Sequence, residues 1–318
     1  MARTRIGIAH NIGSHVWYAR QLMVARQIAV ANDLELIERD ANDDPKVQVA
    51  QILEILEIGI DVLLLSAVRP DDVGVALDAC LASSVRVITE SIAVDHPSVI
   101  SAVRVDDFAA GLDLGRVVGS RVIQKDEVPL RVLLSGFNAL PEAHAREHGF
   151  IEGLRSYHPN LMALYVDGMA QVKSASERTR EALNTCDRGL NFVPDVIFGV
   201  DDESVIGAVA GVRETGRATD DAVTATFGVS PPSGLELLDS GLVTFGQAMF
   251  PEVHSALLMS LAQRAVRGEA IPVLVNPPFA VVASRESDLS WARFYRENDD
   301  GGFELRSDVD NFLILETC

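Results

Sequence analysis

The sequence lacks several features that would assign a function directly. It has three cysteines, Cys80, Cys186 and Cys318, which are too few and too scattered for a disulfide framework or a C-x-x-C metal site. It is also poor in basic residues, with 27 Lys and Arg against 46 Asp and Glu and a formal net charge of -19. A surface of this sign repels phosphate backbones, so we expect no nucleic-acid partner.

Long hydrophobic runs are missing as well. Stretches such as "IGIDVLLLSAV" end well short of the ~18 apolar residues that a membrane span needs. The N-terminal "MARTRIGIAH" enters a predicted strand within a few residues, which leaves no room for a secretory signal. Two expectations for the location stay open: a cytoplasmic protein, or a periplasmic or otherwise extracytoplasmic one whose signal peptide has been removed.

The common cofactor and nucleophile motifs are absent too. No G-x-G-x-x-G follows a strand, and the sequence has neither a Walker loop nor a G-x-S-x-G elbow. "DANDDP" at 40–45 resembles a calcium loop, but it lacks the glycine at position six and the closing glutamate. The simpler interpretation is a helix N-terminus, capped by Asn42, Asp43 or Asp44 before Pro45. We therefore expect no cofactor.

One short motif does point to chemistry. "PEAHAREHGF" places His144, Glu147 and His148 in the order H-x-x-E-H, which is typical of one class of zinc peptidases. The two histidines would share a helical face, but no downstream stretch offers a convincing third ligand. Pro141 favours a first helical turn here, so His144 is expected at the mouth of a strand-to-helix loop, pointing toward a ligand. A metal-dependent hydrolase using His144 and His148 stays a remote alternative.

What the sequence does contain is a regular alternation of apolar strands and amphipathic helices, typical of βαβ units around a parallel sheet. The predicted strands of a first set are "RIGIAH", "LELIER", "DVLLLSA", "VRVITES" and "VISAVRV". Those of a second set are "LRVLLSG", "MALYVDG", "PDVIFGV", "AVTATFGV" and "LVTFGQAMF". The 318 residues therefore predict an α/β protein with two doubly wound parallel-sheet lobes, each with helices on both faces of its sheet.

In such sheets ligands bind outside the carboxyl ends of the strands. The segments that follow the predicted strands include "HNIGSHVWY", "SAVRPDD", "TESIAVDH", "SGFNALPEAHAR", "GVDDES" and "GVSPPSG". They are rich in His, Asp, Ser and aromatic residues and suit a polar ligand. The tail from about Ser287 breaks the alternation, and we expect it to pack back through Trp291, Phe294 and Phe303.

The order and spacing of several segments between residue 5 and about residue 283 carry a family resemblance. They are the opening from "HVWYARQLMVARQ" to "IGIDVLLLSAVRPDDV", then "VRVITES", "RVDDFAAGLDLG", "AREHGFIEGL", "PDVIFGVDDESVIGAVAGVRETG" and "GLVTFGQAMFPEVHSALLMSLAQRAVRGE". In these the chain resembles the type I periplasmic-binding proteins, in the ribose-binding, sugar-binding branch. In that family "PEAHAREHGF" corresponds to a ligand-facing loop and helix start, so the H-x-x-E-H order is interpreted as coincidence.

The resemblance implies two similar lobes joined by a three-strand hinge, closing over a ligand. The crossovers would fall near Val105–Asp106, Met249–Phe250 and Pro278–Phe279. The N-terminal lobe would comprise 1–105 plus 250–278 and the C-terminal lobe 106–249 plus 279–318, with the ligand cleft between them.

The resemblance also implies which residues bind the ligand. Trp17 and Tyr18 take the position of the aromatic pair that stacks on a sugar ring, because the C–H face of a sugar packs on an aromatic plane. The full set of ligand-binding residues that we expect is Asn11, His15, Trp17, Tyr18, Glu90, Ser91, His144, Asp201, Ser230 and Met249.

The polar part of that site departs from the family pattern. Where the family usually has an Asp-Arg pair after the fourth strand, this chain has Ser91–Ile92, with Glu90 adjacent. In the second lobe, the family's cleft Arg is replaced by His144, its Asn by Asp201 and its Asp by Ser230 or Val229. The family's hinge Gln is replaced by Met249. The exchange makes the site more acidic if Glu90 points inward. It favours a polyol, a deoxy or amino sugar, or another polyhydroxylated or cationic compound, and disfavours a carboxylate.

The resemblance therefore predicts a non-catalytic protein that captures a small carbohydrate-like ligand and delivers it to the membrane permease of an ABC importer. Closure on the ligand would stabilise one conformation without covalent chemistry. Family members usually act as monomers, and we expect a monomer here. The main alternative is a cytoplasmic ligand-sensing or regulatory domain of the same fold.

Overall fold

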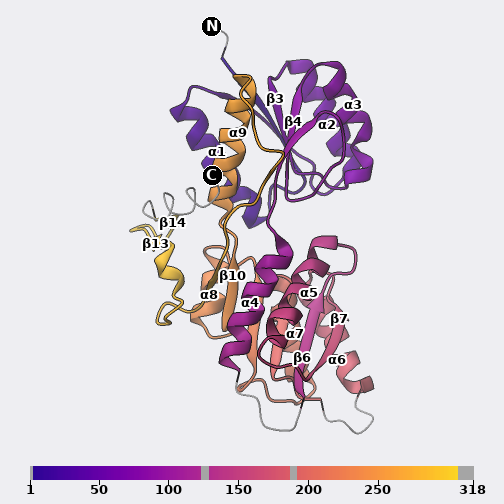
Figure 1. Ribbon diagram of the computed structural model, residues 1–318, viewed down its shortest axis with the longest axis vertical. Coiled ribbons are helices and arrows are strands. Elements are labelled where there is room, and N and C mark those ends of the chain that lie inside the picture. Colours follow the sequence, from indigo (N-terminus) through magenta and orange to yellow (C-terminus); the bar gives the residue numbers. More distant parts are fainter. Residues whose placement is uncertain (1–2, 123–128, 187–191, 307–318) are drawn as a thin grey trace. The chain divides into compact units, whose positions relative to one another are not determined.

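The computed structural model describes residues 3–122, 129–186 and 192–306. The chain forms two α/β units, and each is assembled from separate stretches of sequence (Figure 1). Unit 1 contains residues 3–105 and 250–278, and unit 2 contains 106–249 and 279–306. The chain passes from one unit to the other after Val105, after Met249 and after Pro278.

Unit 1 is built on a parallel sheet of the described strands in the order β11-β5-β4-β3-β1-β2. The strands are β1 (Arg5–His10), β2 (Glu35–Asp40), β3 (Val62–Leu65), β4 (Arg86–Glu90), β5 (Val99–Val103) and β11 (Leu274–Val275). Because all of them run the same way, the ends of β1, β3 and β4 meet at one edge, which we call the carboxyl edge.

Helices cover both faces of this sheet, as successive strand residues alternate between faces. Ile6, Ile8, Val62 and Leu64 pack against α1 (Val16–Ala31) and α9 (Pro251–Val266). The alternate residues Ala9, Leu63 and Leu65 pack against α2 (Pro45–Ile58) and α3 (Gly74–Ala82). The strands are therefore buried on both sides, which explains why they are nearly continuous apolar runs in the sequence.

Unit 2 repeats this architecture with the strand order β12-β10-β9-β8-β6-β7. Its strands are β6 (Leu130–Gly136), β7 (Leu161–Asp167), β8 (Val196–Gly199), β9 (Val223–Phe227), β10 (Phe245–Ala248) and β12 (Ala280–Val282). Its helices are α4 (Asp107–Arg121), α5 (Pro141–Arg155), α6 (Val172–Cys186), α7 (Asp202–Glu214) and α8 (Ser233–Asp239). The strand β12 pairs antiparallel to β10, while the other pairs are parallel.

Glycines allow α4 and α5 to pack closely. A Cβ added to Gly111 or Gly115 of α4 would collide with the α5 backbone, at the carbonyl oxygens of Arg146 and Phe150. A Cβ on Gly149 or on Gly153 of α5 would collide with the α4 backbone in the same way. The four-residue spacing places each pair of glycines on one helical face, and the contact is therefore made by backbone against backbone.

The segment after β12 folds onto unit 2. It contains a 3₁₀ turn (Trp291–Arg293) and a hairpin of β13 (Tyr295–Glu297) and β14 (Phe303–Leu305). Trp291 is 2% exposed, donates from Nε1 to Asp239 Oδ1 at 3.0 Å, and packs edge-on against Phe303. Of the three side chains expected to pack this tail back, Trp291 and Phe303 are confirmed in contact with each other, and Phe294 is half-buried. Its last part, residues 307–318, lies outside the described residues.

The predicted α/β class and all ten predicted strands are confirmed. The N-terminus of α2 is capped by Asp44, whose Oδ1 accepts from the backbone of Lys46 at 2.8 Å and of Val47 at 3.2 Å. The short edge strands β11 and β12 were not predicted. In the part of the chain that the structure describes, no helix combines the length and the apolarity that crossing a bilayer would require.

Candidate functional site

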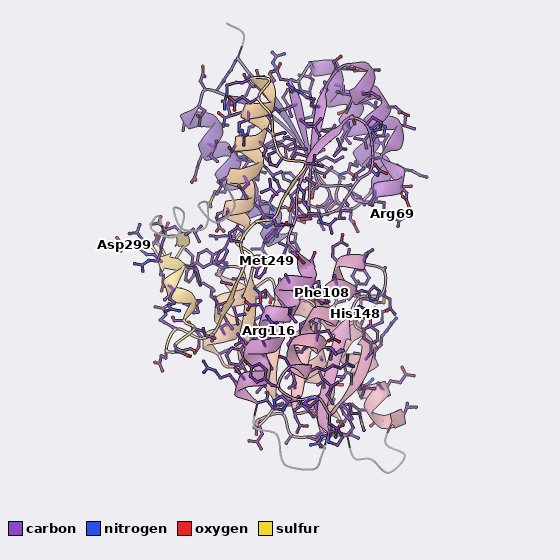
Figure 2. All side chains as sticks on the ribbon, in the orientation of Figure 1. Arg69, Phe108, Arg116, His148, Met249 and Asp299 are labelled. Atoms are coloured by element: carbon purple, nitrogen blue, oxygen red, sulfur yellow. The ribbon has the colours of Figure 1, made fainter. Side chains whose placement is uncertain are left out.

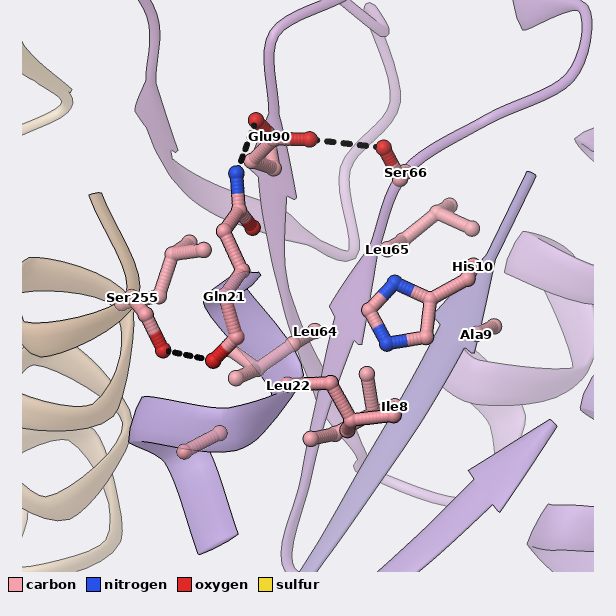
Figure 3. A pocket seen from close by; sticks show the side chains of 12 residues that line it. Ile8, Ala9, His10, Gln21, Leu22, Leu64, Leu65, Ser66, Glu90 and Ser255 are labelled. Atoms are coloured by element: carbon pink, nitrogen blue, oxygen red, sulfur yellow. Dashed lines mark hydrogen bonds between the residues drawn. The ribbon is translucent and has the colours of Figure 1, made fainter. Parts of the chain in front are cut away.

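The carboxyl edge of unit 1 is organised around the carboxylate of Glu90, the last residue of β4. The side chain is buried, at 3% exposure. Its Oε1 accepts from Trp17 Nε1 at 3.2 Å, from Gln21 Nε2 at 3.0 Å and from Ser91 Oγ at 2.5 Å. Its Oε2 accepts from Ser66 Oγ at 2.7 Å, as Figure 3 shows together with the Gln21 contact. We call these five residues, Glu90, Trp17, Gln21, Ser66 and Ser91, the Glu90 network.

Of the two predicted aromatic residues, Trp17 belongs to this network and Tyr18 lies next to it. Trp17 and Tyr18 are half-buried at the first turn of α1, and the Trp17 ring packs edge-on against His254 with ring centres 4.8 Å apart. Burial, followed by the negative charge of Glu90, raises the pKa of Tyr18, although hydrogen bonding by Ser66, Asn11 and Ser91 opposes the shift. Tyr18 therefore remains a neutral phenol, which keeps its proton for donation.

Two buried histidines belong to the same region. His254 on α9 is fully buried, and burial lowers its pKa to about 4 even though Glu90 opposes the shift from 3.8 Å away. Burial also lowers the pKa of His10, against the charges of Glu90, Glu38 and Asp40. Both rings are therefore neutral near pH 7, and the negative charge of Glu90 is met by neutral donors.

A small cavity lies beneath the network, between the sheet and helices α1 and α9 (Figure 3). Its volume is about 20 Å³, which is space for a single water molecule. His10, Gln21, Ser66 and Glu90 supply its polar lining, and Ser255 ties α9 to α1 there by donating to the Gln21 carbonyl at 2.7 Å. The cavity belongs to the interior of unit 1, and its size excludes a sugar ring.

The remaining predicted residues of unit 1 shape the loop before α1. His15 is exposed and caps the helix, because its Nδ1 accepts from the Trp17 backbone at 3.2 Å. The Asn11 side chain accepts from the backbone of Ile12 at 2.7 Å. Ser91 adopts a left-handed backbone conformation, with φ 61°. Local turn geometry thus gives each of these residues a structural task besides any contact with a ligand.

Unit 2 places His144 at the corresponding edge of its own sheet, in the first turn of α5. Its Nε2 lies 3.2 Å from the Asn138 carbonyl oxygen, and its Nδ1 lies 3.6 Å from Glu147 Oε2. Glu147 is buried, which raises the pKa of its carboxyl group, and the nearby His144 opposes that shift. His148 is exposed on the same helix (Figure 2). Among the described residues, no group of three or more His, Cys, Asp and Glu side chains is arranged to hold a metal ion.

Asp201 follows β8 and caps α7, since its Oδ1 accepts from the Ser204 backbone at 2.8 Å. The carboxyl group of the next residue, Asp202, lies where its ionised form is destabilised. Burial, followed by the charge of Asp201, raises its pKa to about 7, and a hydrogen bond to Thr226 lowers it only in part. The predicted pair of roles for Asp201 is thus half established: the cap is present, and ligand contact stays a prediction.

Ser230 and Met249 are both buried in unit 2. Ser230 lies between β9 and α8, and its carbonyl accepts from Gly234. Met249 directly follows β10 and is the last residue of unit 2 before the chain enters unit 1 (Figure 2). Arg146 connects α5 to α4 and to the end of β8. Its Nε donates to Asp107 at 2.7 Å, and its Nη1 donates to the Val200 carbonyl at 3.3 Å.

The structure thus gathers Asn11, Trp17, Tyr18, Glu90 and Ser91 at one edge of unit 1. It adds Gln21, Ser66 and His254, which were not among the predicted site residues. A partial signal existed for two of them. Ser66 opens a segment that follows a strand, and Gln21 lies one helical turn after Trp17. The sequence gives no signal for His254, which reaches the site from a distant helix.

Comparison with known proteins assigns the family. The model of the periplasmic binding protein domain matches residues 6–270, so the chain belongs to the periplasmic binding protein family. The predicted type I, ribose-binding-like membership is confirmed.

Individual relatives are distant but cover most of the chain. The chain is 25% identical over 280 residues to the xylitol-binding protein of Mycolicibacterium smegmatis, covering 86% of this chain and 76% of that one. It is 22% identical over 239 residues to the ribose import binding protein RbsB of Escherichia coli, covering 74% and 76%. A solved periplasmic solute-binding protein of Actinobacillus succinogenes, with bound D-allose, superimposes with a TM-score of 0.77 at 16% identity, covering 89% and 99%.

Proposed function

We propose that this protein is a non-catalytic solute-binding protein that captures a small sugar or sugar-like ligand, such as a polyol or a deoxy or amino sugar. The observation that carries the proposal is the family match over residues 6–270. The names of the two relatives, one binding xylitol and one taking part in ribose import, support a polyhydroxylated ligand.

The chemistry of the unit 1 edge supports the same ligand class. Trp17 and Tyr18 are half-buried, so part of each ring can face the C–H groups of a carbohydrate. The hydroxyl groups of Ser91 and Tyr18 and the carboxamide of Asn11 lie at the same edge and can bind hydroxyl groups. In unit 2, we propose that His144 and Asp201 bind polar groups of the ligand, while Ser230 and Met249 shape the surface around them.

We further propose that the protein acts outside the cytoplasm, as a monomer, and passes its ligand to the permease of an ABC importer. Its family and the import role in one relative's name support the location and the importer. Fractionation of the native host with an antibody to the chain tests the location. Recovery of the protein only with cytoplasmic markers would favour a ligand-sensing domain instead.

A thermal-shift screen of the purified protein against pentitols, hexitols, aldoses and amino sugars tests the central proposal. A ligand that binds only the folded protein stabilises it by about 2.7 kcal/mol at a hundredfold excess over Kd. We expect one stereochemical series to raise the Tm, and titration calorimetry then gives the stoichiometry. If no polyol, sugar or amino sugar raises the Tm, the protein is not a carbohydrate-binding protein.

A further inference from the structure

Four hydrogen-bond donors at the carboxyl edge of unit 1 point inward to Glu90. A serine hydroxyl has one proton to donate, and the protons of both Ser66 and Ser91 go to Glu90. The indole N–H of Trp17 and the amide of Gln21 are engaged by the same carboxylate. An ionised carboxylate accepts and never donates, so it fixes the direction of all four hydrogen bonds.

Tyr18 extends this arrangement toward the surface. Its hydroxyl lies close to the side chains of Ser66, Ser91 and Asn11. The two serine oxygens can meet the phenol only as acceptors, because their own protons go to Glu90. Ser91 is half-buried, so its oxygen lone pairs, and not its proton, are left for a ligand.

Among the described residues, no Lys or Arg forms an ion pair with Glu90, and the one ionisable base within 4.0 Å is the buried, neutral His254. A ligand beside Ser91 therefore meets an oxygen acceptor above a buried negative charge. It must contribute donors of its own, because an acceptor facing an acceptor leaves both groups unsatisfied.

We propose that Glu90 determines ligand specificity as a positioning residue. By accepting the protons of Trp17, Ser66 and Ser91, it leaves the Ser91 hydroxyl as an acceptor beside a buried negative charge, which selects neutral polyols or amino sugars and rejects the corresponding sugar acids. This inference rests on the proposed function and adds to it the polarity of the ligand and the residue that sets it.

The test uses Glu90→Gln, which keeps the shape of the side chain but adds a donor and removes the charge. The control is Asp239→Asn in unit 2, which makes the same chemical change to the carboxylate that accepts from Trp291. Calorimetry measures binding of matched pairs, such as xylitol with xylonate and glucitol with gluconate. In the wild type and the Asp239→Asn variant we expect the alditol to bind at least roughly tenfold more tightly than the acid. In Glu90→Gln we expect that ratio to fall by about tenfold.

A second measurement needs no ligand. The chain has two tryptophans, so its ¹⁵N–¹H spectrum contains two indole N–H resonances. Glu90→Gln should shift the Trp17 resonance alone, and Asp239→Asn that of Trp291 alone. An unshifted Trp17 resonance, or a shifted one with an unchanged alditol-to-acid ratio, overturns the inference while leaving sugar binding intact. A wild-type protein that binds no member of the panel overturns the proposed function, and the inference with it.

Discussion

The indole N–H of Trp17 donates a hydrogen bond to the carboxylate of Glu90, 73 residues further along the chain. The family resemblance predicts that the Trp17 ring stacks on a sugar. A hydrogen bond at its N–H and the packing of His254 from α9 both fix this ring within unit 1. The orientation of the ring is therefore set before any ligand arrives, which lowers the entropic cost of binding.

The substitution Trp17→Phe removes the hydrogen bond to Glu90 that orients the ring. An aromatic ring stays, although it is smaller than the indole, and the N–H is lost, so we expect unit 1 to lose about 1 kcal/mol of stability and the ligand to bind more weakly. Urea unfolding followed by circular dichroism, together with calorimetry, measures both effects. The partner variant Trp291→Phe in unit 2 should destabilise the protein and leave ligand affinity unchanged. Equal affinity losses in the two variants would contradict a specific role for Trp17.

The buried His254 predicts acid sensitivity of unit 1. Burial lowers its pKa to about 4 in the folded state, against an ordinary value of 6.5, so the unfolded chain binds a proton more readily. Stability contributed by the neutral ring is complete above pH 6.5 and is lost as the pH falls toward 4. Between pH 7.5 and 5 this amounts to about 2 kcal/mol.

The variant His254→Gln should remove that part of the pH dependence, whatever its effect at neutral pH. Urea unfolding in a Trp291→Phe background, where Trp17 fluorescence reports on unit 1, gives the slope with pH. His148→Gln, at an exposed position on α5, serves as the control and should keep the wild-type slope. Identical slopes for His254→Gln and the wild type would exclude His254 as the cause.

Asp202 predicts the opposite pH behaviour in unit 2. Its pKa is raised to about 7, mainly by burial and then by Asp201, so the folded state binds a proton more readily than the unfolded chain. Its ionisation therefore destabilises unit 2 as the pH rises from about 4 through 7.

Asp202→Asn should accordingly stabilise the protein at pH 8 and change little near pH 3.5. Because the side chain is partly exposed, we expect roughly 2 kcal/mol, about half of what the pKa shift corresponds to. Unfolding followed by Trp291 fluorescence in a Trp17→Phe background reports on unit 2. The control is Glu203→Gln, which removes the same charge from an exposed neighbouring residue. We expect no comparable gain in stability at pH 8 from this variant.

The close packing of α4 on α5 gives a prediction about stability. Gly115→Ala places a methyl group against the Phe150 carbonyl and Gly153, both of them backbone groups that cannot rotate away. We expect a loss of about 3 kcal/mol or more, measured by urea unfolding. Gly74→Ala makes the same substitution at the start of α3, where nothing lies within 4 Å, and should be neutral or slightly stabilising. Similar losses for both would show that the helix contact is looser than described.

Much of the fold is predictable because its determinants are local. Strands buried on both faces are continuous apolar runs, and Asp44 before Pro45 marks a helix start that a single side chain caps. The edge strands escape such prediction because β11 has two residues and β12 three, too few for a periodic pattern. The glycines of α4 and α5 show their spacing in the sequence, but the spacing does not identify the partner helix.

The site was less accessible to sequence reasoning. The family resemblance located Trp17 and Tyr18, but the direction of Glu90 at the end of β4 depends on the local geometry of that strand, which contains a register irregularity at Val87 and Ile88. The contact of His254 with Trp17 depends on where α9 packs, and that is decided by tertiary structure. Long-range partners of this kind leave no trace in spacing along the chain.

The interleaved assembly of the two units has a consequence for biosynthesis. On the ribosome, β1 to β5 emerge early, but α9 and β11 are made only after unit 2 up to Met249 has been translated. During that interval the sheet face bearing Ile6, Ile8, Val62 and Leu64 has α1 over it without α9. The nascent chain therefore carries a partly covered apolar surface for several seconds or longer. Chaperones that hold unfinished proteins can bind to such a surface.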